Sequence, residues 1–149
     1  MTVRNWTTVA LAAPGCLMAT GFAVALALAA FGRHPMWVSY DLNLSEASAV
    51  RDEAEVARLI EYAEDPNLRR DIRPGLLFER RVRLTPLEAA VAAGDGRVVR
   101  ELLDRGAVID AETWNRLRCA ADGDEVPPTL DASRPSGAVM HCAGITPPW

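Results

Sequence analysis

One long apolar stretch stands out in the pattern of apolar and polar residues along this chain. There is no charged residue between Arg4 and Arg33, and residues 8–32 are almost wholly apolar. A helix rises about 1.5 Å per residue, so this stretch is long enough to cross a hydrocarbon core about 30 Å thick. We therefore predict a transmembrane helix at 8–33 behind a short flank at 1–7.

Two kinds of cleaved leader are alternatives to this anchor. A signal peptide has an apolar region of about 7–15 residues behind a more basic start, and residues 27–31 offer small side chains without a clear cleavage site. A lipoprotein signal would use Cys16, but Pro14 fits that motif poorly and the apolar run before it is short. The pattern favours an uncleaved anchor.

Aromatic and small residues add detail to the predicted span. Aromatic rings favour the membrane interfaces, so the expected anchors are Trp6, Trp37 and Tyr40. Small residues at every fourth position allow a second helix to approach closely. This stripe consists of Gly21, Ala25 and Ala29. Helix docking and chance recurrence in an Ala-rich segment both remain open.

Helical periodicity returns at residues 85–106, with clear start and stop signals. Thr85 is a good N-cap, Pro86 follows where its missing N–H is harmless, and Glu88 completes a capping box. Gly94 can end this helix in the left-handed conformation. A second helix ends at Gly106, and its apolar stripe consists of Val98, Val99, Leu102 and Leu103. We expect two short helices, with Leu102 and Leu103 in the core.

The stretch from Thr85 to Ala107, which begins Thr-Pro-Leu-Glu-Ala-Ala, resembles the ankyrin repeat. It departs from that family at Glu88, where the family usually has His. A weaker copy lies about 43 residues earlier, against a family period of about 33. The copy aligns Leu44, Ala47, Val56, Leu59 and Ile60 with Leu87, Ala90, Val99, Leu102 and Leu103. Arg51 replaces the turn glycine of the copy, and a third unit is hinted at near Trp114 and Leu117.

The fold class that follows is mainly α. We predict a single transmembrane helix, then a short ankyrin-like array of helical hairpins at 34–125, then an irregular Pro-rich tail at 126–149. Two and a half repeats are near the minimum for a continuous core. We expect such an array to be marginal without help from the membrane, the tail or a partner.

An Arg-rich insert at 67–84 separates the two clearer repeats. Its six arginines, against Asp71 and Glu79, give it a net charge of +4. They are Arg69, Arg70, Arg73, Arg80, Arg81 and Arg83. The ankyrin resemblance places the partner-contacting finger loops here. The insert either pairs with the chain's own acidic helices or contacts lipid headgroups or an acidic partner.

The tail carries two further candidates. Its terminal Trp149 either docks on another protein or belongs to a free tail. Cys119 and Cys142 are candidates for a disulfide that would form in an oxidising compartment, and two free thiols are the alternative. A zinc site built from these two residues and His141 lacks a fourth ligand, and a solvated turn is the better interpretation of the acidic residues at 122–125.

Charge and motif content limit the function. A net charge of −4 and an isoelectric point near 5.2 argue against nucleic acid as a main partner. The sequence has no phosphate-binding Gly-rich loop, no paired metal-protease histidines and no nucleophile elbow. We therefore expect no cofactor, no metal, no small-molecule substrate and no enzyme activity.

The sequence predicts a non-catalytic, single-pass accessory or assembly subunit of a larger membrane complex, for which a respiratory or photosynthetic complex would be a suitable host. Its expected partners are other membrane subunits and the lipid bilayer. The expected location is a bacterial inner membrane, with the C-terminal domain in the periplasm because the N-terminus is short. The alternative is a free-standing, membrane-tethered binding or regulatory protein, and an enzyme with an unfamiliar site is a third hypothesis.

Overall fold

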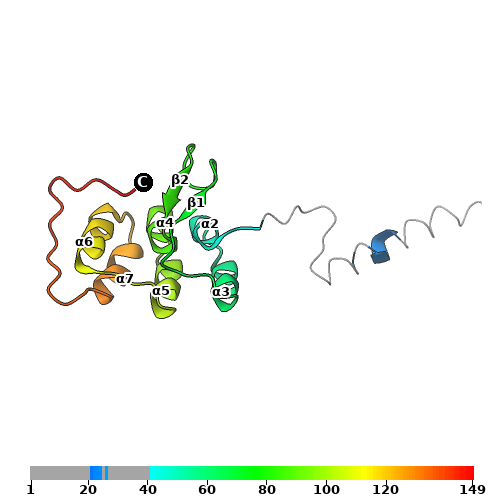
Figure 1. Ribbon diagram of the computed structural model, residues 1–149, viewed down its shortest axis with the longest axis horizontal. Coiled ribbons are helices and arrows are strands. Elements are labelled where there is room, and N and C mark those ends of the chain that lie inside the picture. The colour runs from blue at the N-terminus through cyan, green and yellow to red at the C-terminus, as the bar shows by residue number, and fades with distance from the viewer. Residues whose placement is uncertain (1–20, 25, 27–40) are drawn as a thin grey trace, which may run out of the picture. The chain divides into compact units, whose positions relative to one another are not determined.

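Three consecutive helical hairpins and one β-hairpin make up most of what the computed structural model describes, which is residues 21–24, 26 and 41–149. The elements are α2 (Leu44–Ala49), α3 (Glu53–Glu61), β1 (Arg70–Ile72), β2 (Val82–Leu84), α4 (Pro86–Ala93), α5 (Gly96–Asp104), α6 (Ala111–Ala120) and α7 (Val126–Ala132). The first helices of the three pairs, α2, α4 and α6, lie side by side, and so do α3, α5 and α7 (Figure 1). The result is a two-layered array within one compact unit, Leu42–Trp149.

The prediction of a membrane-spanning helix is corrected by the structure. In the part of the chain that it describes, no helix is both long enough and apolar enough to cross a bilayer. Helical backbone within the expected span is described only for residues 21–24 and 26, whereas a crossing needs about 20 consecutive residues. The predicted single-pass architecture, membrane localisation and periplasmic C-terminal domain are corrected with it. The rest of the predicted span lies outside the described residues.

The helix pair α4–α5 forms for the local reasons that its sequence indicates. The Thr85 side chain accepts a hydrogen bond from the backbone N–H of Glu88, and the Glu88 carboxylate accepts one from the N–H of Thr85, at 3.2 and 2.9 Å. At the other end Gly94 is left-handed, with φ 75°. Asp95 then caps α5 by accepting from the N–H groups of Arg97 and Val98. Both ends of α4 and the start of α5 are thereby capped by residues next to them in sequence.

The pair α2–α3 repeats this turn without a glycine. Arg51 takes the left-handed conformation, with φ 63°, at the position that corresponds to Gly94. The backbone N–H of Asp52 donates to Ala47 O at 3.0 Å, just as the N–H of Asp95 donates to Ala90 O at 3.2 Å. The two turns therefore match 43 residues apart, as the aligned sequences indicate. The first helices of these two pairs therefore end in turns with the same backbone hydrogen bond.

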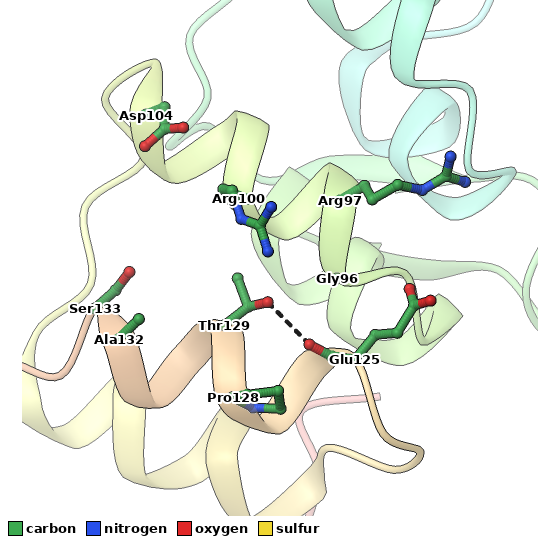
Figure 2. A pocket seen from close by; sticks show the side chains of 9 residues that line it. All are labelled: Gly96, Arg97, Arg100, Asp104, Glu125, Pro128, Thr129, Ala132 and Ser133. Carbon is green, nitrogen blue, oxygen red and sulfur yellow. Dashed lines mark hydrogen bonds between the residues drawn. The ribbon is translucent and has the colours of Figure 1, made fainter.

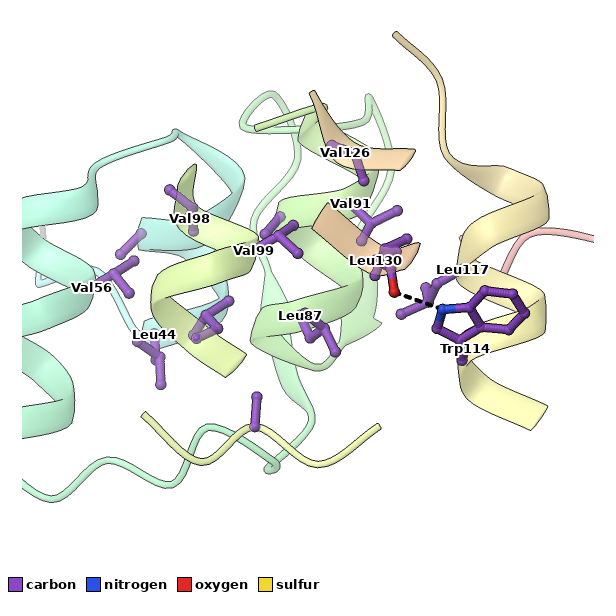
Figure 3. Packing of buried hydrophobic residues seen from close by; sticks show 14 of the residues in the cluster. Leu44, Val56, Leu87, Val91, Val98, Val99, Trp114, Leu117, Val126 and Leu130 are labelled. Carbon is purple, nitrogen blue, oxygen red and sulfur yellow. Dashed lines mark hydrogen bonds between the residues drawn. The ribbon is translucent and has the colours of Figure 1, made fainter. Parts of the chain in front are cut away.

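One apolar cluster runs through all three helical pairs (Figure 3). It includes the aligned residues of both repeats, Leu44, Ala47, Val56 and Leu59 with Leu87, Ala90, Val99 and Leu102. Leu102 is fully buried, as expected, whereas Ile60 and Leu103 are only partly buried against the cluster. Trp114 and Leu117 extend the core into the third pair. Helix α5 therefore buries Leu102 completely in the core and Leu103 only in part.

Residues 126–132 form helix α7, although the sequence predicted an irregular tail from 126 onward. Two prolines occupy its first turn, where their missing N–H groups would have no partner in any case. Val126 and Leu130 are four residues apart and both are fully buried, so they form an apolar stripe one helical turn long. The prediction was wrong because it relied on the number of prolines, whereas the effect of a proline depends on its position within the helix.

The Arg-rich insert forms a two-stranded antiparallel hairpin. Ile72 pairs with Val82 and Arg70 with Leu84 across strands β1 and β2. The buried face of this hairpin packs against α2 and α4, where a second apolar cluster consists of Ala49, Ile72, Val82, Leu84 and Ala89. A two-stranded hairpin is marginal alone. This one is stabilised by the helices beneath it.

Candidate functional site

The β-hairpin is fixed to the first helical pair by Arg73. Its guanidinium donates to both carboxylate oxygens of Glu46 in α2, at 2.6 and 2.9 Å. The Arg73 backbone N–H donates to the same carboxylate at 3.2 Å, and the N–H of Asn43 does so at 3.3 Å. The Glu46 side chain is only 4% exposed. Since this bidentate pair joins the first residue after β1 to α2, it anchors the hairpin rather than serving a partner.

Arg69 anchors the hairpin to the second helical pair. Its guanidinium donates to Glu88 Oε1 at 2.5 Å and to the backbone oxygen of Arg83 at 3.2 Å. Arg116 of α6 lies 3.6 Å from the same Glu88 oxygen, and the Glu88 side chain is 2% exposed. Two cations thus compensate one buried carboxylate, as a buried charge requires. Glu88 therefore links the hairpin, α4 and α6.

Two asparagine side chains hold the ends of the insert. The side-chain oxygen of Asn67 accepts from the N–H of Val108 at 2.7 Å, and its amide nitrogen donates to Gly106 O at 3.2 Å. Asn43 donates to the backbone oxygen of Asp71 at 3.0 Å. The loop before β1 is therefore tied to the connection between α5 and α6. These contacts give the hairpin a fixed orientation on the array.

The remaining four arginines of the insert are exposed and, among the described residues, have no carboxylate within ion-pair distance. They are Arg70, Arg80, Arg81 and Arg83. Arg70 and Arg83 line a shallow surface groove of about 440 Å³, together with Arg69, Asp71 and Asn43. The sequence alone placed all six arginines in one group. In the structure, Arg69 and Arg73 are structural anchors, and the other four are exposed side chains that a partner could contact.

The tail residues that the sequence singled out lie on the array. Cys119 and Cys142 are joined in a disulfide, with the sulfur atoms 2.04 Å apart. Trp149 is partly buried and packs against both apolar clusters.

Gly21 lies in the described helical residues 21–24 and is exposed. The other proposed membrane residues lie outside the described residues: Ala25, Ala29, Trp6, Trp37 and Tyr40.

A second groove, of about 570 Å³, lies between α5 and α7 (Figure 2). Arg100 extends from α5 toward α7, and Arg97, Asp104 and Glu125 add mixed charges around it. The Thr129 hydroxyl donates to the backbone oxygen of Glu125 at 2.9 Å, so it has no base beside it. Nothing in this groove pairs a nucleophile with an activating group.

Metal chemistry has little support in the described part of the chain. No group of three His, Cys, Asp or Glu side chains there is placed to hold a metal ion. The two cysteines of the suggested zinc set are already bonded to each other. His141 is exposed, and its backbone N–H and carbonyl both bond to the Asn115 side chain.

Comparison with known proteins adds no relative. No family model, curated protein or solved structure matches this chain. The ankyrin resemblance therefore rests on the residues of this chain alone.

Replacing Glu46 by Gln should give a pH-dependent loss of stability. Burial acts to raise the pKa of Glu46, but hydrogen bonds and charge from Arg73, with the N–H of Asn43, hold that pKa below its ordinary value. A lowered pKa stabilises the folded state above the unfolded value of about 4.3, and this contribution is lost as pH falls through the folded pKa. We expect Glu46→Gln to lose about 1–3 kcal/mol at pH 7.

Urea unfolding from pH 7 down to pH 3 would measure this effect. The gap between Glu46→Gln and wild type should begin to narrow below about pH 4.3, where the unfolded carboxylate takes up a proton, and should close as pH falls through the lower pKa of Glu46 in the folded state. Glu79→Gln, on the exposed part of the same insert, is the matched control and should leave stability unchanged at every pH. A gap that stays constant with pH would contradict the ion-pair explanation.

Proposed function

We propose that this chain is a non-catalytic, ankyrin-like interaction module that serves as an accessory subunit of a larger protein complex. It holds an acidic surface of a partner protein through the exposed face of the Arg-rich hairpin. The observation that carries this proposal is the set of four exposed arginines without carboxylate partners in the described part of the chain.

The charge distribution favours a compact acidic partner over a long polyanion. The insert carries +4 within a chain total of −4, so the remaining residues carry −8. An extended nucleic acid would meet that negative charge on either side of the hairpin. A short acidic segment of a protein can pair with the guanidinium groups and stay clear of the acidic helices. Such local complementarity raises association rates and selects partners.

The anchored hairpin also favours binding. Arg69 and Arg73, at the two ends of β1, hold the hairpin on the buried carboxylates of Glu88 and Glu46. Because its backbone is already ordered, association would lose less conformational entropy than it would with a free loop. The groove lined by Arg70 and Arg83 offers two guanidinium groups to one carboxylate-bearing segment. Arginine is well suited to this, because its planar fork can bind a carboxylate through two hydrogen bonds.

A non-catalytic role is supported by what the buried polar side chains do. Glu46 and Glu88 cap helices and pair with arginines, and Asp95 caps α5. The hydroxyl groups of Ser45 and Ser48 donate to backbone oxygens. Each of these groups already has a structural partner, which leaves none of them poised for proton transfer.

A direct test measures the binding of a fluorescent poly-glutamate peptide of about ten residues to the full chain, by anisotropy at low salt. The double variant Arg70→Ala/Arg83→Ala should bind about tenfold more weakly, or about 0.7 kcal/mol for each guanidinium. The matched control is Arg97→Ala/Arg100→Ala on α5, which removes the same charge elsewhere. It should change the affinity less than about twofold. Equal losses in the two variants would refute a hairpin-specific site.

Mild affinity purification of the tagged full chain tests the accessory-subunit role separately. A partner should co-purify at fixed stoichiometry with wild type and be lost with Arg70→Ala/Arg83→Ala. If the chain purifies as a monomer but the hairpin still binds the acidic peptide, a free-standing regulatory binder replaces the accessory subunit.

A further inference from the structure

The C-terminal segment after α7 is fastened to α6 at two neighbouring points. The side chain of Asn115 accepts from the N–H of His141 at 2.8 Å and donates to the His141 carbonyl at 3.2 Å. One turn further along α6, Cys119 is bonded to Cys142. The Asn115 amide thus bonds to both the N–H and the carbonyl of His141, as a neighbouring β-strand would. The disulfide holds the next residue, Cys142.

Beyond the disulfide, the segment is held chiefly at its end. Residues 143, 144, 146 and 147 are exposed, whereas Ile145, Pro148 and Trp149 are partly buried. Trp149 packs against the main core cluster and also against the hairpin cluster, so it covers apolar surface from both. Figure 1 shows the chain end lying beside α4 and β2. We call this surface, formed by α4 and the β-hairpin beneath Trp149, the Trp149 seat.

Several features of this arrangement would allow the tail to leave the Trp149 seat without unfolding the array. Neither strand nor helix joins the segment to the array, and residues 133–149 contain neither element. Trp149 packs against both apolar clusters, and aromatic side chains are typical of the few residues that dominate peptide binding.

We propose that the Trp149 seat is a peptide-binding site for an extended, proline-containing segment that ends in an aromatic residue, and that the chain's own tail occupies it while the Cys119–Cys142 disulfide is intact. This inference does not depend on the acidic partner proposed for the hairpin. The seat and the four exposed arginines are different surfaces.

The disulfide controls the tether length. Trp149 is about 7 residues from Cys142 and about 11 from Ala138, the next residue before it that is buried in the core. The local concentration of a tethered ligand falls roughly as the −3/2 power of tether length, so opening the disulfide and releasing the exposed Asn115–His141 contacts lowers it about twofold. The apparent affinity of the seat for a competing segment then rises by the same factor.

The release step requires a dithiol reductant. Its thiolate attacks the exposed Cys142 sulfur, the S–S bond breaks, and the Cys119 sulfur leaves and takes up a proton. The second thiol of the reductant then displaces Cys142 from the mixed disulfide. The protein gains two thiols, and the reductant is oxidised to its own disulfide.

The test uses the full chain and a fluorescent peptide, Gly-Ile-Thr-Pro-Pro-Trp, which copies residues 144–149. Anisotropy should show the tightest binding to the variant Trp149→Ala, in which the seat is empty. Wild type reduced with a dithiol should bind about twofold more tightly than oxidised wild type. A peptide with Ala in place of Trp is the control and should bind none of them.

Two results would overturn the proposal. One is a folded Trp149→Ala variant, checked by its thermal melt, that binds the peptide no better than oxidised wild type. The other is equal peptide affinity of reduced and oxidised wild type. Light scattering should show monomers in every state. If wild type forms dimers only on reduction, the segment that enters the Trp149 seat is the tail of a second copy rather than a separate partner.

Discussion

Replacing Trp114 by Ala should lower the free energy of unfolding by about 3–5 kcal/mol. Trp114 is 1% exposed and is the largest fully buried side chain in the described part of the chain. Its indole N–H donates to the backbone oxygen of Leu130 at 2.8 Å (Figure 3). The Arg134 guanidinium lies 4.9 Å from the ring centroid. The substitution removes apolar burial, a link from α6 to α7 and a cation–π contact together.

Urea unfolding followed by far-ultraviolet circular dichroism measures this loss without depending on tryptophan fluorescence. Trp114→Phe separates the contributions, because it keeps an aromatic ring but removes the indole donor to the Leu130 carbonyl, which still accepts from the N–H of Ser133. We expect that variant to lose about 0.5–1.5 kcal/mol. If Trp114→Ala were within about 1 kcal/mol of wild type, the third helical pair would not be packed on the array as described.

Replacing Leu102 by Ala should destabilise the chain by about 2–5 kcal/mol. Leu102 is fully buried on α5, in the cluster that both repeats share. Truncation removes apolar contacts and leaves a cavity that the helices on either side of α5 can fill only in part. The helices packed against α5 are α3, α4 and α7.

Leu103 gives the matched control on the same helix. It is only partly buried against the cluster, so Leu103→Ala should lose clearly less than Leu102→Ala. Chemical unfolding of both variants under one set of conditions compares them directly. A larger loss at Leu103 would mean that α5 presents a different face to the core.

The sequence predicted best where local chemistry decides the structure. The capping box of Thr85 and Glu88 and the left-handed Gly94 determine where α4 begins and ends. The turns after α2 and α4, 43 residues apart, share one backbone hydrogen bond. Arg51 was harder to interpret, because its left-handed φ of 63° is uncommon for a residue with a side chain.

The predictions that failed depended on tertiary structure or on composition. Apolar composition suggested a long helix at 8–33, and α7 was missed because proline was taken as a sign of irregular structure. The insert was predicted without strands, since Ile72, Val82 and Leu84 become a buried face only when α2 and α4 lie beneath them. Short strands of three residues carry too little periodic pattern to be recognised.

The candidate site was predicted in outline only. Charge alone identified the arginines of the insert, but it could not separate Arg69 and Arg73 from the four exposed ones. That separation depends on Glu88 and Glu46, which lie 19 and 27 residues away in sequence. The tail contacts are also long-range, since Asn115 and His141 are brought together only by the packing of α6.

The side chain of Asn67 gives the array an unusual mechanical property. In a simple repeat protein each unit contacts only its neighbours, so an end unit can fray alone. Here Asn67 bonds to Gly106 and Val108 beyond α5, while Glu88 joins the hairpin to α6. A force applied to the hairpin is therefore shared among all three helical pairs. A partner pulling on this surface would meet the resistance of the whole unit rather than that of one repeat.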